Sequence, residues 1–101
     1  MQQGACYMIT CITCKLEGRD SRYFGETART PYDRGLDHWN ALENGNGESP
    51  LVEHHMEEHP DLPHNFVMEV KSFHERPQDR QGEEAEFIGN FEGSLLNRRG
   101  E

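Results

Sequence analysis

Two cysteines separated by two residues constrain the fold of this 101-residue chain more than any other feature. Cys11 and Cys14 come at the end of a β-forming run, residues 5–12. Hydrophobic residues make up only 33% of the chain, so a domain of this size has a small core and gains from a staple such as a metal ion. Because the three cysteines are an odd number without a visible secretory signal, we expect metal binding rather than a disulfide framework.

The overall charge of the chain argues against nucleic acid as a partner. The uneven distribution of the charges along the chain weakens this argument. Nineteen acidic residues stand against ten basic ones, a formal net charge of -9, whereas contacts to phosphate need Lys and Arg. Residues 15–34 nevertheless carry five basic and four acidic side chains, a net charge of +1. Eight of the ten basic residues are arginines, which suit fixed, bidentate contacts to anions.

The distribution of apolar residues predicts neither a membrane span nor a leader. No apolar run approaches the roughly 18 residues that a spanning helix needs. The N-terminus has no basic segment followed by an apolar one, so we expect no signal peptide and an intracellular location, nuclear or cytoplasmic. Residues 97–101 do not close an element, which is compatible with a fragment of a longer chain.

Turn and capping residues divide the chain into strands and helices. Residues 5–12 and 23–25 read as two strands joined by the polar turn 15–21, and they pair as a hairpin. Thr30 and Pro31 are typical of a helix start, and we expect this helix to run to about Leu42. A second hydroxyl–proline pair at residues 49–50 starts a short helix that ends at residues 59–60.

The second half of the chain continues this mixed pattern. Residues 66–71 alternate between apolar and other side chains with period two, which predicts a strand. Residues 79–88 read as a helix closed by Gly89, and residues 95–97 as a short return to the core. We therefore expect one small α+β domain over residues 1–101, with its core at about 6–97.

Three groups of residues along this order carry chemical interest. Tyr7, Tyr23 and Gly25 lie on the predicted hairpin. Arg34 and His38 are four residues apart and so share one face of a helix. The acidic stretch at residues 83–86 lies on the last helix. Taken one at a time, each group is better explained as strand aromatics or solvated charge, and only their joint order indicates a site.

This order resembles the GIY-YIG nuclease domain, and more narrowly the branch in Penelope-like retroelements that has a cysteine pair between its two name-giving motifs. Residues 7–9 (Tyr-Met-Ile) stand where the first motif ends, and residues 23–25 (Tyr-Phe-Gly) match the second. The continuation Gly-Glu-Thr at residues 25–27, followed by Arg29, is also similar. The first motif lacks its Gly-Ile, because Ala5 and Cys6 precede Tyr7. The resemblance covers about residues 6–97.

The resemblance implies a three-stranded antiparallel sheet flanked by helices and a metal-dependent DNA endonuclease of the mobile-element type. The residues on which the family's functional positions fall are, for catalysis, Tyr7, Tyr23, Arg34, His38 and Glu84, and, for contacts to DNA, Arg29 and Asn97. Among three nearby glutamates, Glu84 is chosen on register alone.

The chemistry of these residue types agrees with phosphodiester hydrolysis. A single carboxylate, Glu84, suits Mg²⁺ or Mn²⁺, which keep most of their waters. Arg34 can form a fork with the scissile phosphate. By analogy with the family, Tyr7 is the general base. Its unperturbed pKa is near ~10, so we expect a metal ion, Arg34 and His38 to lower that pKa.

The two cysteines need two further ligands for a closed zinc site. His54 and His59 lie around the short second helix, and the related retroelement domains also pair two cysteines with two downstream histidines. We therefore expect Cys11, Cys14, His54 and His59 to hold a structural Zn²⁺. His55 remains an alternative to His54, and Cys6 an alternative to either cysteine.

Two other functions are compatible with the sequence. One is a catalytically inactive, zinc-stabilised module that binds nucleic acid or protein. The other is a protein-interaction module whose acidic surface binds a basic partner. We also expect Trp39 in the core, and His64 and His74 at the surface or in loops. The oligomeric state and the DNA target do not follow from the sequence.

Overall fold

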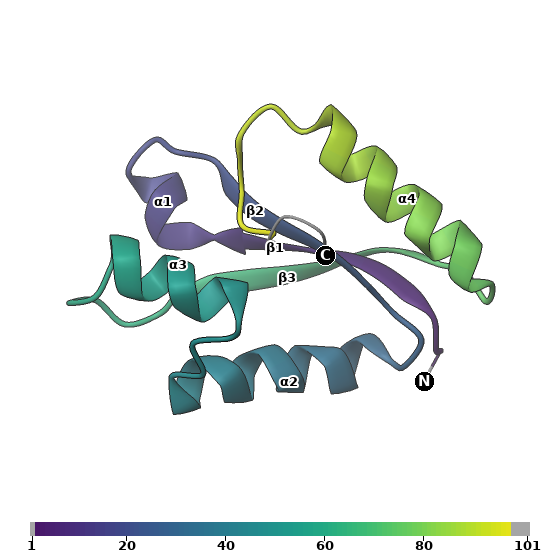
Figure 1. The fold of residues 1–101 in the computed structure, drawn as a ribbon, viewed down its shortest axis with the longest axis horizontal. Coiled ribbons are helices and arrows are strands. Elements are labelled where there is room, and N and C mark those ends of the chain that lie inside the picture. The colour runs from purple at the N-terminus through teal and green to yellow at the C-terminus, as the bar shows by residue number, and fades with distance from the viewer. Residues whose placement is uncertain (1, 98–101) are drawn as a thin grey trace.

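A four-stranded sheet in the order β3-β1-β2-β4 forms the centre of the structure, a computed structural model that describes residues 2–97 (Figure 1). The central strand β1 (Ala5–Cys11) pairs antiparallel with β2 (Ser21–Thr27) and with β3 (Phe66–Phe73). The predicted hairpin of β1 and β2 is thus confirmed.

The expectation of three antiparallel strands is wrong, because a fourth strand adds a parallel pair. β4 (Ser94–Leu95) runs parallel to β2. The backbone N–H of Ser94 donates to the carbonyl of Asp20 at 2.8 Å, and that of Leu96 donates to the carbonyl of Arg22 at 2.8 Å. The predicted short return of residues 95–97 therefore supplies hydrogen-bond partners for part of the outer edge of β2.

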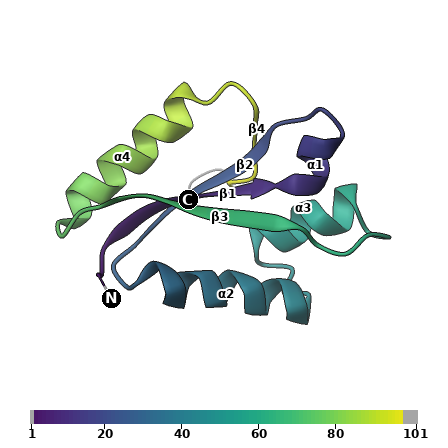
Figure 2. The same ribbon diagram turned by 180° about the vertical axis from the view of Figure 1, so that it is seen from behind.

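Helices cover both faces of the sheet. α2 (Pro31–Asn44) and α3 (Pro50–Glu58) lie on one face, and α4 (Pro77–Asn90) lies on the other (Figures 1 and 2). Because side chains alternate along a strand, neighbouring residues of β1 and β2 face different helices. On the face of α2 and α3, the buried core consists of Tyr7, Ile9, Tyr23 and Leu51. On the face of α4, the ring of Phe24 lies 5.5 Å from that of Phe87 and 5.4 Å from that of Phe91.

The capping signals placed the starts of α2 and α3 correctly. The Thr30 hydroxyl accepts a hydrogen bond from the Asp33 N–H at 3.1 Å, and Pro31 is the first residue of α2. Gly45 closes α2 with φ 64°, a left-handed conformation that favours glycine. α3 likewise begins at a proline and ends before His59, as expected.

Two local predictions are wrong. Residue 12 was expected at the end of the first strand and residues 15–16 in the turn 15–21. Residues 12–16 instead form the short helix α1 (Ile12–Leu16), whose start is capped by the Cys11 sulfur accepting from the Cys14 N–H at 3.5 Å. α4 begins earlier than expected, at Pro77, and continues through Gly89 to Asn90. The contact of Phe87, in the last turn, and that of the C-cap Phe91 with Phe24 offset the weak helix propensity of the glycine.

Among the helices of the described residues, none combines the length and the apolar character that crossing a membrane requires.

Candidate active site and metal centre

The Tyr7 hydroxyl is the meeting point of the predicted catalytic residues from β1 and α2. It lies 2.9 Å from Nε2 of His38 and accepts a hydrogen bond from Nε of Arg34 at 3.2 Å. Tyr7 is 1% exposed and His38 is 7% exposed, so this contact is made out of bulk water. The spacing of four residues on one helix face places Arg34 and His38 together on the same phenol.

Tyr23 completes this cluster from β2. Its ring stacks on that of Tyr7 with centroids 6.2 Å apart and meets the His38 ring edge-on at 5.4 Å. Tyr23, Arg34 and His38 also line a cavity of about 330 Å³ next to the start of α3, with Asp37, Ala41, Asn46, Glu48, Ser49 and Pro50. Four of the five predicted catalytic residues are therefore in one place.

Burial sets the protonation states in this cluster. It raises the pKa of Tyr7 well above its usual value, and the neighbouring Arg34 offsets only part of this rise. It lowers the pKa of His38 to about 4, helped by the positive charge of Arg34. Without a metal ion, Arg34 and His38 do not lower the pKa of Tyr7, because desolvation of the phenolate outweighs the nearby guanidinium. At neutral pH, Tyr7 is a phenol and His38 is a neutral imidazole.

Gly25 has a steric reason for its place in the second motif. It pairs with Tyr7 across the β1–β2 ladder. A Cβ atom at this position would lie 2.3 Å from Cζ and 2.4 Å from the hydroxyl oxygen of Tyr7. The missing side chain of Gly25 is what lets the phenol reach His38 and Arg34.

Asp37 neutralises part of the positive charge beside this cluster. Its carboxylate forms an ion pair with Arg29 and lies 3.5 Å from a guanidinium nitrogen of Arg34. Sequence reasoning singled out both arginines but not this carboxylate. The signal was present, since Asp37 is three residues from Arg34 on α2 and therefore its neighbour on the helix surface.

Glu84 lies on α4, the helix that covers the opposite face of the sheet. It lines a different cavity, of about 550 Å³, with Glu26, Gln81, Ala85, Ile88 and Gly89. β2 contributes Tyr23 to the first cavity and Glu26, three residues further on, to the second. β4 pairs with β2 only at Ser21 and Arg22.

The Asn97 side chain binds backbone in this structure. Its Oδ1 accepts from the Phe24 N–H at 2.9 Å, and its Nδ2 donates to the Phe24 carbonyl at 2.7 Å. The amide therefore continues the edge pairing of β2 beyond β4. This arrangement indicates a structural role for Asn97, where the resemblance implied contact with DNA.

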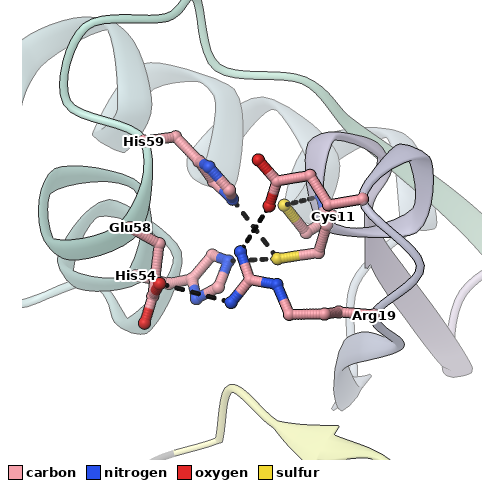
Figure 3. A network of polar contacts seen from close by, with 7 residues as sticks. Cys11, Arg19, His54, Glu58 and His59 are labelled. Atoms are coloured by element: carbon pink, nitrogen blue, oxygen red, sulfur yellow. Dashed lines mark hydrogen bonds and ion pairs between the residues drawn. The ribbon is translucent and has the colours of Figure 1, made fainter.

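The four predicted zinc ligands also come together, at the junction of β1, α1 and α3 (Figure 3). The ligand atoms of Cys11, Cys14, His54 and His59 all lie within 4.8 Å of one another. The Cys14 sulfur is 3.3 Å from Nε2 of His54 and 3.2 Å from Nε2 of His59. In a tetrahedral zinc site the sulfur–nitrogen edge is about 3.6 Å, so the observed spacing fits this geometry.

Backbone structure explains why these ligands meet. α1 turns the chain directly after β1, so that Cys14 returns towards Cys11. α3 ends at Glu58, and the change in backbone direction at His59 brings that ring beside His54, with centroids 5.4 Å apart. Cys11, Cys14 and His59 are buried, and an exposed bridge from Arg19 to Glu17 and Glu58 lies across the cluster (Figure 3).

Donor type and environment suit a metal ion here. Burial lowers the pKa of His54, which keeps its imidazole neutral and able to coordinate. Burial also raises the pKa of the Cys11 thiol to about 11, so without a cation this sulfur stays protonated. The cluster could hold a metal ion such as zinc, which would stabilise the thiolate forms. The alternatives His55 and Cys6 are not part of it.

The expectation for Trp39 is wrong, whereas those for His64 and His74 are confirmed. Trp39 was expected in the core but is 54% exposed, and its ring packs edge-on against His64 at 5.0 Å. His64 also contacts a carboxylate oxygen of Glu43 at 3.0 Å. His64 and His74 both lie in loops, as expected, and Nε2 of the half-buried His74 lies 2.8 Å from the Glu83 carboxylate. These partners come from other elements, and no local sequence signal identified them.

Comparisons with protein-family models, with curated proteins and with solved structures found no match to this chain.

Proposed function

We propose that this chain is a divalent-metal-dependent DNA endonuclease domain of the GIY-YIG type, stabilised by a structural zinc ion. One observation supports the proposal above all others. The buried Tyr7 hydroxyl is shared between His38 and Arg34 beside a cavity that Tyr23 also lines. In this proposal Tyr7 is the base, His38 is the proton acceptor behind it, and Arg34 binds the phosphodiester from the cavity.

The protonation states suggest a specific proton path. Because the His38 imidazole is neutral, its Nε2 can accept the Tyr7 proton while the Tyr7 oxygen takes a proton from the attacking water. The water oxygen then forms the new P–O bond, and the leaving sugar oxygen departs and takes up a proton from solvent. Arg34 donates to the phosphoryl oxygens, where negative charge develops. This path does not need a free phenolate, which the raised pKa of Tyr7 disfavours.

Glu84 is the proposed ligand for Mg²⁺ or Mn²⁺. Glu84 and Glu26 line one cavity, where Glu26 is paired with Arg80, and hard oxygen donors such as the Glu84 carboxylate suit these cations. When bound, the ion would neutralise phosphate charge. The proposal requires substrate at the edge of β2, the strand that contributes Tyr23 to one cavity and Glu26 to the other.

The Cys11, Cys14, His54 and His59 cluster is the proposed structural zinc site. Four protein ligands leave no open position for substrate, which is typical of a structural rather than a catalytic zinc. The ion would join the β1–α1 corner to α3 and so hold the helix layer against the sheet. It is separate from the metal proposed at Glu84.

Cleavage of supercoiled plasmid with Mg²⁺ or Mn²⁺ tests the activity. We expect relaxation of the plasmid by the wild-type chain, loss of cutting in Glu84→Ala and retained cutting in Glu86→Ala, an exposed control on the same helix. Zinc content and circular dichroism of the same samples would show that each protein is folded. A folded, zinc-loaded wild type that does not cut would contradict the enzyme proposal. It would favour the inactive module that binds nucleic acid or protein.

A further inference from the structure

A second group of metal-binding side chains lies on the other face of the sheet. The ligand atoms of Cys6, His74 and Glu83 lie within 4.8 Å of one another. They come from β1, from the residue after β3 and from α4, so tertiary packing alone brings them together. None of them belongs to the tyrosine cluster or to the zinc site proposed above.

The carboxylate of Glu83 is held in one orientation at this cluster. Its Oε1 lies 2.8 Å from Nε2 of His74, and its Oε2 accepts from the Ser72 hydroxyl. The Cys6 side chain is fully buried at 0% exposure, and its sulfur lies 3.4 Å from the Arg80 carbonyl oxygen.

The neighbours of the Cys6 sulfur are mainly electron donors. A carbonyl oxygen, a carboxylate and an imidazole surround it. The nearby guanidinium of Arg80 is directed elsewhere, to Glu26 at 2.8 Å and to the carbonyls of His74 and Glu75. Cys6 is buried, while the His74 and Glu83 side chains are 33% and 23% exposed, so a cation from solvent can reach the three ligand atoms and replace the protons that lie between these groups and their partners.

We propose that Cys6, His74 and Glu83 bind a divalent transition metal of the zinc class, with a water molecule as fourth ligand. Thiolate, imidazole and carboxylate are the three donor types that zinc takes from proteins. Mg²⁺ and Ca²⁺ are disfavoured because a sulfur ligand does not suit hard cations. Ser72 is a positioning residue, since it orients the Glu83 carboxylate without being a ligand.

Such an ion would tie α4 to the sheet. α4 has no side-chain cap at Arg76 and contains Gly82 and Gly89, so its intrinsic helix stability is low. A metal bound to Glu83 on α4, Cys6 on β1 and His74 after β3 would link the helix to two strands. It would also fix the helix that carries Glu84.

Metal content of the purified full chain tests this site without reference to DNA cleavage. After loading with zinc and removal of free ion, we expect about two equivalents per chain for the wild type by elemental mass spectrometry. Glu83→Gln and Cys6→Ala should each retain about one equivalent, while the exposed control Glu86→Gln retains about two. Ser72→Ala should weaken zinc binding at this site about tenfold and leave the other site unchanged.

Cobalt provides a second readout that separates the two sites. Loading the double variant Cys11→Ser/Cys14→Ser with Co²⁺ should still give sulfur-to-cobalt charge-transfer absorption from Cys6, and this band should disappear when Cys6→Ala is added. If Cys6→Ala does not fold, His74→Gln replaces it in the zinc measurement. A folded wild type that binds one equivalent, unchanged by Glu83→Gln, would overturn the proposal and leave a hydrogen-bonded network at this position.

Discussion

The Tyr7 hydroxyl and Nε2 of His38 lie 2.9 Å apart, and both side chains are buried. This contact joins the centre of the sheet to the middle of α2. It also links a phenol whose pKa is raised to an imidazole whose pKa is lowered to about 4. The neutral pair is therefore the stable form at pH 7, and a shared proton is the simplest way for it to act as a base.

Removal of the Tyr7 hydroxyl should separate catalysis from folding. In Tyr7→Phe we expect cleavage to fall by at least about 100-fold, the usual contribution of a general base. The free energy of unfolding should fall by only about 1–3 kcal/mol, because the buried His38 and the half-buried Arg34 lose a hydrogen-bond partner. Plasmid cleavage and urea unfolding measure the two effects. Tyr32→Phe, at a 60% exposed position, is the control, and full activity in Tyr7→Phe would exclude the base role.

The lowered pKa of His38 predicts a stability change with pH. In the unfolded chain this histidine has its ordinary pKa of 6.5, and in the folded chain about 4. Because the unfolded state binds the proton more tightly, stability is full above pH 6.5 and is lost as the pH falls towards 4. Between pH 7 and pH 5 the loss is about 2 kcal/mol.

Urea unfolding at pH 7 and pH 5 measures this loss. Metal release can add its own pH dependence, so the comparison is made with His38→Gln at equal zinc loading. We expect the free energy of unfolding of His38→Gln to change less between pH 7 and pH 5 than that of the wild type, by about the 2 kcal/mol that His38 contributes. Equal pH dependence in the two proteins would contradict a buried, neutral His38.

Removal of zinc should destabilise the whole domain. A strong chelator should lower the unfolding temperature and expose apolar surface, since binding at 1,000 times the dissociation constant contributes about 4 kcal/mol. His54→Gln should have the same effect. His55→Gln is the matched control on α3 and should keep wild-type zinc affinity, measured by competition with a chromophoric chelator. A stronger effect of His55→Gln than of His54→Gln would assign the third ligand to His55.

Gly25→Ala should disturb the cluster by steric overlap. The new methyl group would lie 2.3 Å from Cζ of Tyr7, and the phenol would have to leave its position beside His38. We expect a loss of about 1–3 kcal/mol in stability together with loss of cleavage. Gly82→Ala, where no atom lies within 4 Å of the added methyl group, should instead stabilise α4 by about 0.5–1 kcal/mol. Thermal unfolding of both variants tests the contrast.

Asp37→Asn should strengthen binding to DNA. Asp37 is paired with Arg29 and lies beside Arg34, so its removal leaves both guanidinium groups available to phosphate. We expect higher affinity with a steeper salt dependence, measured by fluorescence anisotropy at several salt concentrations. Asp33→Asn makes the same charge change in the first turn of α2 and should have a smaller effect. If both variants raised DNA affinity equally, the effect of Asp37 would come from net charge alone and not from its contacts with the two arginines.

Short-range signals in the sequence predicted much of this structure. Thr30 with Pro31 marked the start of α2, because a hydroxyl cap and a proline act within one helical turn. The two-residue spacing of Cys11 and Cys14 predicted a metal cluster, and His54 and His59 join it as expected. The four-residue spacing of Arg34 and His38 placed both on Tyr7, once the helix lay against the hairpin.

Tertiary structure alone decided the remaining features. The parallel pairing of β4, the ion pair of Asp37 with Arg29, and the meeting of Cys6, His74 and Glu83 all join residues that the sequence patterns treat separately. Glu84 and the tyrosine cluster lie on opposite faces of the sheet, and this likewise depends on which face α4 covers. Propensities and spacings act over a few residues, whereas these contacts depend on strand register and helix packing, which form only when the whole chain folds.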